Sequence, residues 1–194
     1  MEKIDKLIKL RDSVKQIGIP TLREQTLNLL LSFVSVLKPK KILEIGTAYG
    51  CSGIGMLLAS PKAKLVTLEI SDEAVMNARK NFKDFELSDR VEIYHGDASE
   101  IIPVISGKFD FVFIDGPKSH YLEYMPYIKE LLTEDGVIFA DNVLLKDYGI
   151  NEPEKRNRTA FRNMQAFLEE MKNDTDFITN LIDLEDGVLI ASKK

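Results

Sequence analysis

Cysteine, histidine and tryptophan are scarce in this sequence, and their scarcity excludes several classes of protein. The 194 residues include one cysteine, two histidines and no tryptophan. The single cysteine, Cys51, cannot form an internal disulfide, and no Cys/His cluster has the spacing of zinc ligands. A chain without disulfides fits a reducing compartment, so we expect a cytoplasmic protein.

Long apolar runs and an excess of positive charge are also missing. No apolar run approaches the roughly 20 residues that a membrane-spanning helix needs, so we expect no membrane association. The formal net charge is −5, whereas sequence-independent binding to nucleic acid depends on phosphate neutralisation by Lys and Arg. Indiscriminate binding to nucleic acid is therefore disfavoured, although a local basic patch is compatible with this charge.

The length and composition are those of one globular domain. With 194 residues, 44% of them hydrophobic, the chain can bury one sizeable core but is short for two. We therefore predict a single domain over residues 1–194. Apolar residues at helical intervals near the N-terminus predict helices within residues 1–36 that pack on the remainder.

From residue 40 onward, segments typical of strands alternate with segments typical of helices. The predicted strands are residues 41–45, 64–68, 91–94, 109–114, 136–140, 177–182 and 188–191. Helices are predicted between the fourth and fifth strands and at residues 52–60, 72–85 and 160–172. This alternation indicates a doubly wound α/β fold with a mostly parallel, seven-stranded sheet. The turn signal at 185–187 predicts that the last two strands form an antiparallel C-terminal hairpin.

The first strand ends in a glycine-rich turn. In open α/β sheets, ligands bind beyond the carboxyl ends of the strands. Gly46 and Gly50 permit close approach of the backbone to a ligand at a helix N-terminus, and Glu44 and Ser52 flank them. A plain tight turn between strand and helix is the alternative. The spacing is not the Gly-x-Gly-x-x-Gly of dinucleotide oxidoreductases, which disfavours that class of enzyme.

Acidic residues follow the second and third strands. Glu69 stands about 20 residues beyond the glycine turn, where nucleotide-binding folds place an acid for the ribose hydroxyls. Asp97 can reach an adenine amino group, and Ala98 leaves room for the ring. Each of these residues alone would be an ordinary surface residue.

Oxygen-bearing side chains follow the fourth and fifth strands. Asp115 comes after one strand, and Asp141 and Asn142 come after the next. Two carboxylates and an amide oxygen are hard ligands suited to Mg²⁺ or Ca²⁺, with positions left for water or substrate. The alternative is that the two aspartates cap the helices that follow them. The pair together with Asn142 favours a metal site.

Five motifs in this order resemble those of the metal-dependent O-methyltransferases, the family that includes the catechol and caffeoyl-coenzyme A enzymes. The motifs are built on residues 43–50, 69, 96–98, 113–121 and 141–144. The resemblance extends from about residue 20 to the end of the chain, and it implies a Rossmann-like class I methyltransferase fold. Pro117 stands where plant-type members carry an acid, so a caffeoyl-coenzyme A acceptor is not expected.

The resemblance also implies site residues. With the glycine turn included, the S-adenosylmethionine site comprises Leu22, Glu44, Gly46, Ser52, Glu69, Asp97, Ala98 and Asp115. The same resemblance assigns Mg²⁺, or another divalent cation, to Asp115, Asp141 and Asn142. Asp115 and Lys118 are the expected catalytic residues, with Lys118 either taking a proton from the acceptor or stabilising its anion.

The segment after Asp141 resembles the bacterial tRNA 5-hydroxyuridine methyltransferases of the same family. This resemblance implies a tRNA anticodon loop as the partner, methylated at the wobble base, with a small catechol as the alternative acceptor. Four cationic residues are assigned to RNA binding: Lys155, Arg156, Arg158 and Arg162. Ordinary surface charge is an equal alternative for them. The family further implies a homodimer, and a non-enzymatic RNA-binding module is the least favoured interpretation.

Overall fold

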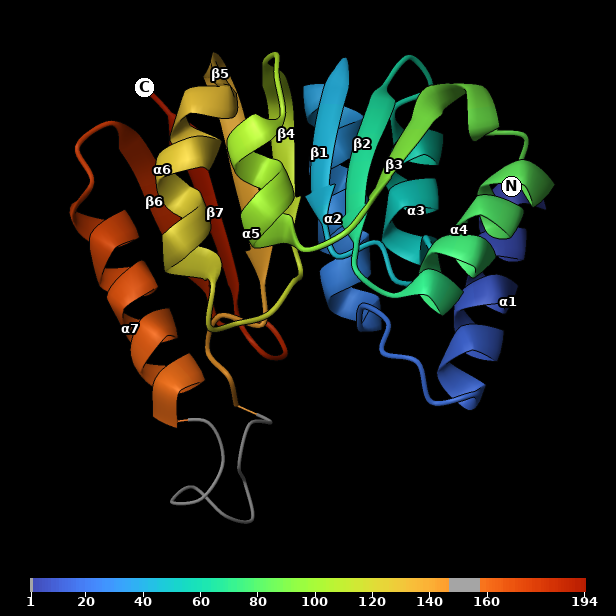
Figure 1. Cartoon of the computed structure of the whole chain (residues 1–194), viewed down its shortest axis with the longest axis horizontal. Helices are drawn as coiled ribbons and strands as arrows, with labels where there is room; N and C mark the ends of the chain where they lie inside the picture. Colours follow the sequence, from blue (N-terminus) through green and yellow to red (C-terminus); the bar gives the residue numbers. More distant parts are fainter. Residues whose placement is uncertain (1, 147–157) are drawn as a thin grey trace.

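The computed structural model describes residues 2–146 and 158–194, which form a seven-stranded sheet between helices (Figure 1). The strands are β1 (Lys41–Ile45), β2 (Lys64–Glu69), β3 (Val91–His95), β4 (Phe109–Ile114), β5 (Leu132–Asp141), β6 (Phe177–Ile182) and β7 (Val188–Lys193). The α-helices are α1 (Glu2–Gln16), α2 (Glu24–Leu37), α3 (Cys51–Ala59), α4 (Asp72–Asp84), α5 (Ala98–Ile101), α6 (Tyr121–Leu131) and α7 (Arg158–Asn173). Two short 3₁₀ helices are η1 (Ser88–Arg90) and η2 (Ile102–Val104).

The sheet has the strand order β3-β2-β1-β4-β5-β7-β6. The first five of these strands pair in parallel, whereas β7 is antiparallel to both β5 and β6. The predicted mostly parallel sheet with a C-terminal hairpin is therefore confirmed. The chain winds outward from β1 to β3 and then returns to place β4 beside β1. Ligands bind at this reversal in doubly wound sheets, so the residues after β1 and β4 are the first to consider.

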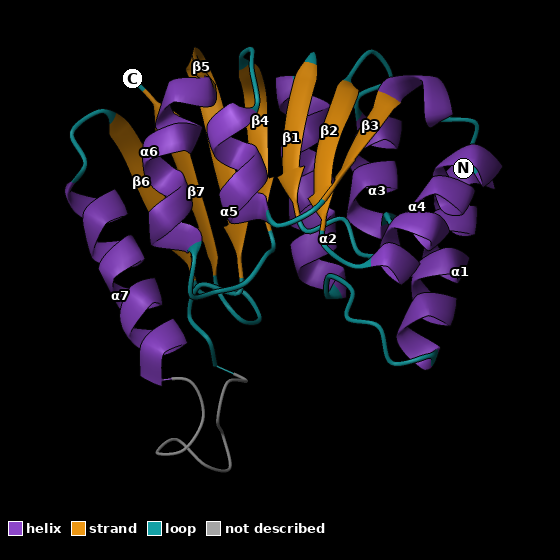
Figure 2. Ribbon diagram, in the orientation of Figure 1, coloured by secondary structure: helices purple, strands orange, loops and turns teal. Residues whose placement is uncertain are grey.

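Helices cover both faces of the sheet, and two apolar clusters fill the space between them (Figure 2). Buried residues of α1 to α4 pack against one face, where Ile42 and Phe113 point. Residues of α6 and α7 pack against the other face, where Leu43 and Ile114 point. Successive strand residues alternate between the two faces, which is why apolar side chains run continuously along the central strands.

The ends of several elements follow from local chemistry. Ser71 caps α4, because its hydroxyl accepts a hydrogen bond from the backbone of Ala74 at 3.3 Å. β5 begins at Leu132, before the predicted residue 136, because Leu132 pairs with Phe109 across an irregularity in the register. Among the described residues, no helix is long and apolar enough to cross a membrane.

Candidate active site

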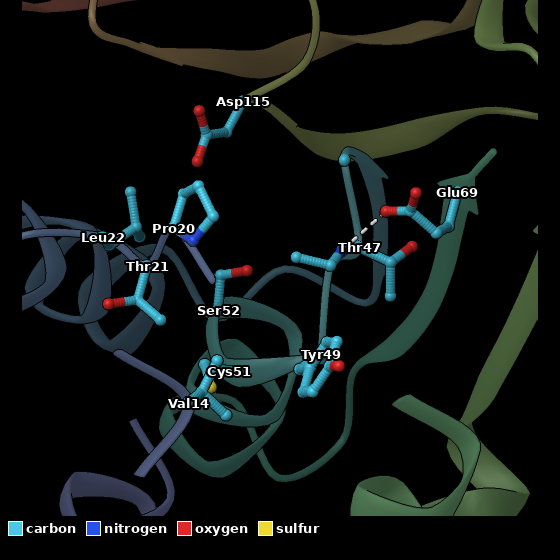
Figure 3. A pocket seen from close by; sticks show the side chains of 12 residues that line it. Val14, Pro20, Thr21, Leu22, Thr47, Tyr49, Cys51, Ser52, Glu69 and Asp115 are labelled. Atoms are coloured by element: carbon cyan, nitrogen blue, oxygen red, sulfur yellow. Dashed lines mark hydrogen bonds between the residues drawn. The ribbon is translucent and has the colours of Figure 1, made fainter. Parts of the chain in front are cut away.

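A two-part cleft opens at the carboxyl ends of β1, β2 and β4 (Figure 3). It consists of two adjoining cavities of about 240 Å³ each. Both cavities are lined by Gly46, Glu69 and Asp115, so these three residues form the waist of the cleft. The first cavity extends toward Leu22 and Ser52. The second extends toward α6 and the segment that follows β3, and it is lined there by Gly96, Asp97, Ala98 and Tyr124.

Gly46 is the position at which the cleft requires glycine. Its φ is +97°, a conformation that side-chain-bearing residues rarely adopt. A Cβ added there would lie 2.3 Å from the carbonyl oxygen of Asp115, far inside van der Waals contact. The backbone of Asp115 also donates to the carbonyl oxygen of Ile45 at 2.9 Å. The turns after β1 and β4 are thus in direct backbone contact.

Glu69 is held at the waist by two backbone groups. One carboxylate oxygen accepts from the amide of Ala48 at 2.8 Å, and the other accepts from the amide of Ser71 at 2.9 Å. These bonds fix the carboxylate at the end of β2, with lone pairs left over because each oxygen has more than one acceptor site. The contact of Glu69 with ribose hydroxyls stays a prediction.

Asp97 begins α5 and lines the second cavity. One of its oxygens, Oδ1, accepts from the amide of Ser99 at 2.8 Å and from the Ser99 hydroxyl at 2.6 Å. These two bonds hold the pKa of Asp97 below its ordinary value. A charged carboxylate can accept a hydrogen bond from an amino group. The small side chain of Ala98, which also lines the second cavity, leaves space beside it.

Glu44 lies beneath the cleft and lines neither cavity. Its side chain is 0% exposed and accepts from the hydroxyls of Ser52 at 2.5 Å and Thr67 at 2.6 Å. Burial raises the pKa of Glu44 to about 7 despite these bonds. Glu44 therefore supports the turn and Ser52 from below, and its predicted contact with the cofactor stays a prediction.

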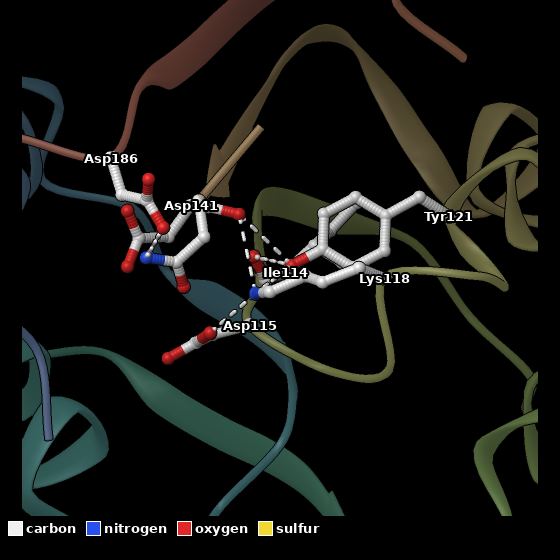
Figure 4. Close-up of polar contacts among 7 residues, drawn as sticks. Ile114, Asp115, Lys118, Tyr121, Asp141 and Asp186 are labelled. Carbon is white, nitrogen blue, oxygen red and sulfur yellow. Dashed lines mark hydrogen bonds and ion pairs between the residues drawn. The ribbon is translucent and has the colours of Figure 1, made fainter. Parts of the chain in front are cut away.

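Lys118 joins the cleft to the ends of β4 and β5 (Figure 4). Its ammonium donates to Asp115 Oδ1 at 2.8 Å, to the Tyr121 hydroxyl at 2.7 Å and to the carbonyl oxygen of Asp141 at 3.3 Å. Burial alone would lower the pKa of Lys118, but the charge of Asp115 and the bond to Tyr121 raise it well above its usual value. The ammonium is therefore a fixed positive charge.

Asp141 and Asn142 lie next to this cation, at the end of β5. Asp141 is 4% exposed, and burial followed by the negative charge of Asp115 raises its pKa. Asn142 has φ +56°, and its side-chain nitrogen lies 3.5 Å from Asp186 Oδ2. With the nitrogen turned toward Asp186, the amide oxygen is the atom left for a cation.

The donor set fits a divalent cation in its chemistry. A buried carboxylate whose pKa is raised by a second carboxylate favours a bound cation or a proton, and an amide oxygen stands beside it. In the described part of the chain, no group of three or more His, Cys, Asp or Glu side chains is placed to hold a metal ion. The expected ligand set has only two such side chains, because its third member is the amide of Asn142. The helix-cap alternative fails for Asp115, because α6 begins after His120.

Asp186 is the residue that sequence reasoning missed. It is 4% exposed, and the β6–β7 turn that carries it accepts from the backbone of Val143 and Leu144 at 3.0 Å each. The sequence indicated only a turn at 185–187, because nothing local connects this turn with residue 142. The sequence gives no sign that this acid is buried, since acids in turns are usually solvated.

The predicted RNA-binding residues fall partly outside the described chain. Lys155 and Arg156 lie there, and Arg158 begins α7. Arg162 is exposed on α7. The next residue along α7 is Asn163, whose side chain donates to the carbonyl oxygen of Ser119 at 2.8 Å and ties α7 to the turn that carries Lys118.

Comparison with known proteins gives consistent matches along the chain. The family model described as O-methyltransferase matches residues 2–194. A catechol O-methyltransferase of Niastella koreensis is 32% identical over 174 residues, which are 82% of this chain and 77% of that protein. An O-methyltransferase of Aspergillus hancockii is 32% identical over 117 residues, 58% of this chain, and that stretch spans about half of the relative's length, 46%.

Solved structures share the fold. The crystal structure of a Podospora anserina methyltransferase with bound S-adenosylhomocysteine (SAH) superposes on this chain with a TM-score of 0.85. The two sequences are 26% identical, and the superposition covers 98% of this chain and 88% of the other. The Rossmann-like methyltransferase fold implied by the sequence resemblance is therefore confirmed.

Proposed function

This chain belongs to the O-methyltransferase family, whose enzymes take their methyl group from S-adenosylmethionine, and we propose that it methylates one of two neighbouring oxygens of its acceptor beside a divalent cation. One observation carries the proposal. Asp115 lines both cavities of the cleft and also accepts from Lys118, whose ammonium reaches the Asp141 carbonyl at the end of β5, so the proposed cofactor site and reaction site meet at one carboxylate.

The shape of the cleft supports the cofactor half of the proposal. We assign the methionine part of S-adenosylmethionine to the first cavity, against Leu22 and Ser52. The adenine belongs in the second cavity, where Asp97 accepts from its amino group and Ala98 leaves room for the ring. Glu69 at the waist accepts from the ribose hydroxyls between them. The sulfonium then lies near Asp115.

We assign the divalent cation, Mg²⁺ or a similar ion, to Asp115, Asp141 and Asn142. A cation at this place lowers the pKa of an acceptor hydroxyl, so that the nucleophile is available near neutral pH. The chain's own contribution is to present two carboxylates and an amide oxygen, with the Lys118 ammonium 2.8 Å from Oδ1 of Asp115.

The role of Lys118 is electrostatic in this proposal. Its ammonium is held in the charged form by Asp115 and Tyr121, which disfavours a proton transfer to it. The proton of the acceptor hydroxyl would leave to solvent, and the fixed cation would stabilise the oxyanion that this loss produces. Most of the acceleration then comes from the orientation of two bound reactants, as expected for a methyl transfer without a covalent enzyme intermediate.

Two acceptors satisfy the requirement for neighbouring oxygens. In 5-hydroxyuridine the 5-hydroxyl lies beside the 4-carbonyl, and the resemblance of residues 141–165 to tRNA methyltransferases makes the tRNA wobble base the acceptor we propose. A small catechol is the second candidate, favoured by the 32% identity to a relative described as a catechol O-methyltransferase. The arginines of α7, Arg158 and Arg162, would contribute to the binding of tRNA but not of a small catechol.

The deciding experiment is methyl transfer from labelled S-adenosylmethionine, with Mg²⁺ or with a chelator, to tRNA carrying 5-hydroxyuridine and to a simple catechol. Labelled tRNA with little catechol product supports the wobble-base enzyme. Catechol product alone supports the small-molecule enzyme. Full activity in the chelator would contradict the metal assignment.

Asp141→Ala tests the same assignment within the chain. We expect it to abolish metal-dependent turnover while S-adenosylmethionine still binds, because Asp141 lines neither cavity of the cleft. Asp135→Ala, at an exposed position on the same strand, is the control and should keep both properties. An active Asp141→Ala enzyme would contradict the metal assignment.

A further inference from the structure

Glu44 is a buried acid beneath the cleft, and the function proposed above does not use it. Its carboxyl group is enclosed by α3, because a Cβ added to Gly53 would lie 2.9 Å from Oε2 of Glu44. Ser52 donates to Oε1 at 2.5 Å, and Thr67 donates to Oε2 at 2.6 Å. The hydroxyl oxygens of Thr67 and Thr47 are in turn 2.6 Å apart. The four residues thus form one chain of hydrogen bonds from Ser52 to Thr47, which we call the Glu44 chain.

Both ends of the Glu44 chain reach the cleft. Ser52 and Thr47 line the first cavity, to which we assigned the methionine part of S-adenosylmethionine (Figure 3). The two middle members, Glu44 and Thr67, are fully buried and line neither cavity of the cleft. A change of charge in the middle of the chain therefore reaches a ligand through the hydroxyl group at one of its two ends.

The number of protons in the Glu44 chain decides what its ends offer to a ligand. Each hydroxyl group has one proton to donate, and an ionised carboxylate has none. With Glu44 ionised, three hydroxyl protons make the three bonds, so Ser52 and Thr47 both donate into the chain and offer only lone pairs to the cavity. With Glu44 protonated, four protons are present for three bonds. One hydroxyl proton at an end of the chain is then left for a ligand.

The methionine part of the cofactor carries a carboxylate that needs such a donor. The helix α3 begins without a side-chain cap, and its first two residues, Cys51 and Ser52, line the first cavity. The positive end of a helix favours an anion, so we place the cofactor carboxylate there, next to Ser52. The ammonium group of the cofactor then belongs at the waist of the cleft, beside the acidic side chains of Asp115 and Glu69.

The ionisable groups around Glu44 bring its change of charge close to neutral pH. Burial, opposed by the bonds from two hydroxyls and assisted by the negative charges of Asp115 and Glu69, raises the pKa of Glu44 to about 7. On α3, Cys51 stays neutral, because burial raises its pKa to about 12. The cation of Arg11, on α1, acts on Cys51. A ligand that bonds to one charge state of Glu44 better than to the other therefore shifts a balance that is already close.

We infer that Glu44 is a positioning residue for the cofactor: it takes up a proton when the cofactor binds, and the Glu44 chain then donates a hydrogen bond to the cofactor carboxylate. The inference rests on the proposed function for the place of the methionine part, in the first cavity. The proton comes from solvent, and no covalent bond of the cofactor changes. By linkage, the affinity for the cofactor falls as pH rises through the range in which the free protein loses this proton.

The first test is a calorimetric titration of SAH, which lacks the charge of the sulfonium. Titrations at pH 8 in phosphate and in Tris measure proton uptake, because the two buffers differ in their heat of ionisation. We expect wild type to take up between about half a proton and one proton for each SAH bound, and its affinity to fall about tenfold between pH 6 and pH 8. The matched ligand is 5′-methylthioadenosine, which has no amino-acid part and should bind without proton uptake. Equal uptake with both ligands overturns the inference.

Glu44→Gln separates this role from a purely structural one. The glutamine amide donates one hydrogen bond to the chain and accepts another, so it imitates protonated Glu44 at every pH. We expect the variant to bind SAH at pH 8 within about twofold of the wild-type affinity at pH 6, without proton uptake. The control is Glu73→Gln, the same replacement at an exposed residue that accepts from the Tyr49 hydroxyl in the wall of the same cavity. It should keep the proton uptake of wild type.

The inference and the proposed function fail in different experiments. Wild type that binds SAH without proton uptake, or uptake that persists in Glu44→Gln, overturns the role of Glu44 and leaves the methyl-transfer assays to decide the function. These titrations contain no acceptor and no metal ion. Proton uptake that requires Glu44, in a chain that methylates neither tRNA nor catechol, would leave the inference standing and reject the proposed function.

Discussion

The ammonium of Lys118 lies 2.8 Å from Oδ1 of Asp115. The lysine side chain is 9% exposed and the aspartate side chain 30% exposed, so the pair spans the boundary between the interior and the cleft. Asp115 lines both cavities of the cleft, while Lys118 reaches back to Tyr121 and to the end of β5. The carboxylate at the waist of the cleft is therefore paired with a largely buried cation.

Replacement of that cation should affect the reaction more than cofactor binding. We expect Lys118→Gln to lower kcat about 10²- to 10³-fold, the cost of removing one group that stabilises a developing oxyanion. KM for S-adenosylmethionine should change little, because Lys118 lines neither cavity. Steady-state kinetics measure both. Lys108→Gln, at an exposed residue before β4, is the control, and a variant of Lys118 with normal kcat would contradict the electrostatic role.

Two glycines with similar backbones should respond differently to alanine. Gly46 and Gly18 both have positive φ, +97° and +83°, but an added Cβ meets the Asp115 carbonyl at Gly46 and nothing within 4 Å at Gly18. We expect Gly18→Ala to cost about 1 kcal/mol of unfolding free energy and Gly46→Ala more than about 3 kcal/mol. Urea unfolding measures the difference, and equal losses would contradict the close contact between the two turns.

Local patterns predicted the sheet well because its central strands are continuous apolar runs bounded by turns. The strand at 177–182 was predicted with the bounds of β6, since polar turn residues follow it and Gly187 ends the turn. β5 was predicted too short, because its first residues include Thr133 and Asp135, which lie in the irregular stretch of the register between Leu132 and Val137 and lack the alternation of a regular strand.

The sequence was less informative about side chains that act across the fold. Glu44 was predicted to contact the cofactor because it precedes the glycine turn. Strand residues alternate between faces, and Glu44 points with Ile42 toward the α1–α4 side, beneath Ser52. Asp186 meets Asn142 only because β7 pairs with β5, a contact between residues 44 positions apart.

The buried acid Glu44 should make stability depend on pH. Burial raises its pKa from 4.5 to about 7 in the folded state. A raised carboxyl pKa means that the folded state holds the proton more tightly, so this stabilising contribution is present below pH 4.5 and is lost as pH rises toward 7. We expect a loss of about 3 kcal/mol over that range from this group.

Glu44→Gln tests this pH dependence, since glutamine keeps the shape and the hydroxyls of Ser52 and Thr67 can bond to it. The unfolding free energy of the variant, measured in urea at pH 5 and pH 8, should fall by about 3 kcal/mol less than that of wild type. Glu100→Gln, at an exposed residue of α5, should follow wild type. Parallel pH profiles for wild type and Glu44→Gln would contradict a protonated Glu44.

Asp186 should position Asn142 for the cation. Its carboxylate lies 3.5 Å from the Asn142 amide nitrogen, and the Asp186 and Gly187 carbonyls bond to the backbone just after Asn142. Asp186→Asn keeps the size and the backbone bonds but removes the charge that attracts the amide nitrogen. The amide can then turn, so we expect Mg²⁺ affinity to fall about tenfold, as for other residues that orient a metal ligand.

Titration of Mn²⁺ by electron paramagnetic resonance measures this affinity without any acceptor or turnover. Asp183→Asn, in the same turn region but paired with Lys146 at the surface, provides the matched control and should bind the ion like wild type. A purely structural role for Asp186 would lower the unfolding free energy and leave the affinity of the folded protein unchanged. That result would assign Asp186 to the stability of the β6–β7 turn and leave Asn142 oriented by its own backbone, with φ +56°.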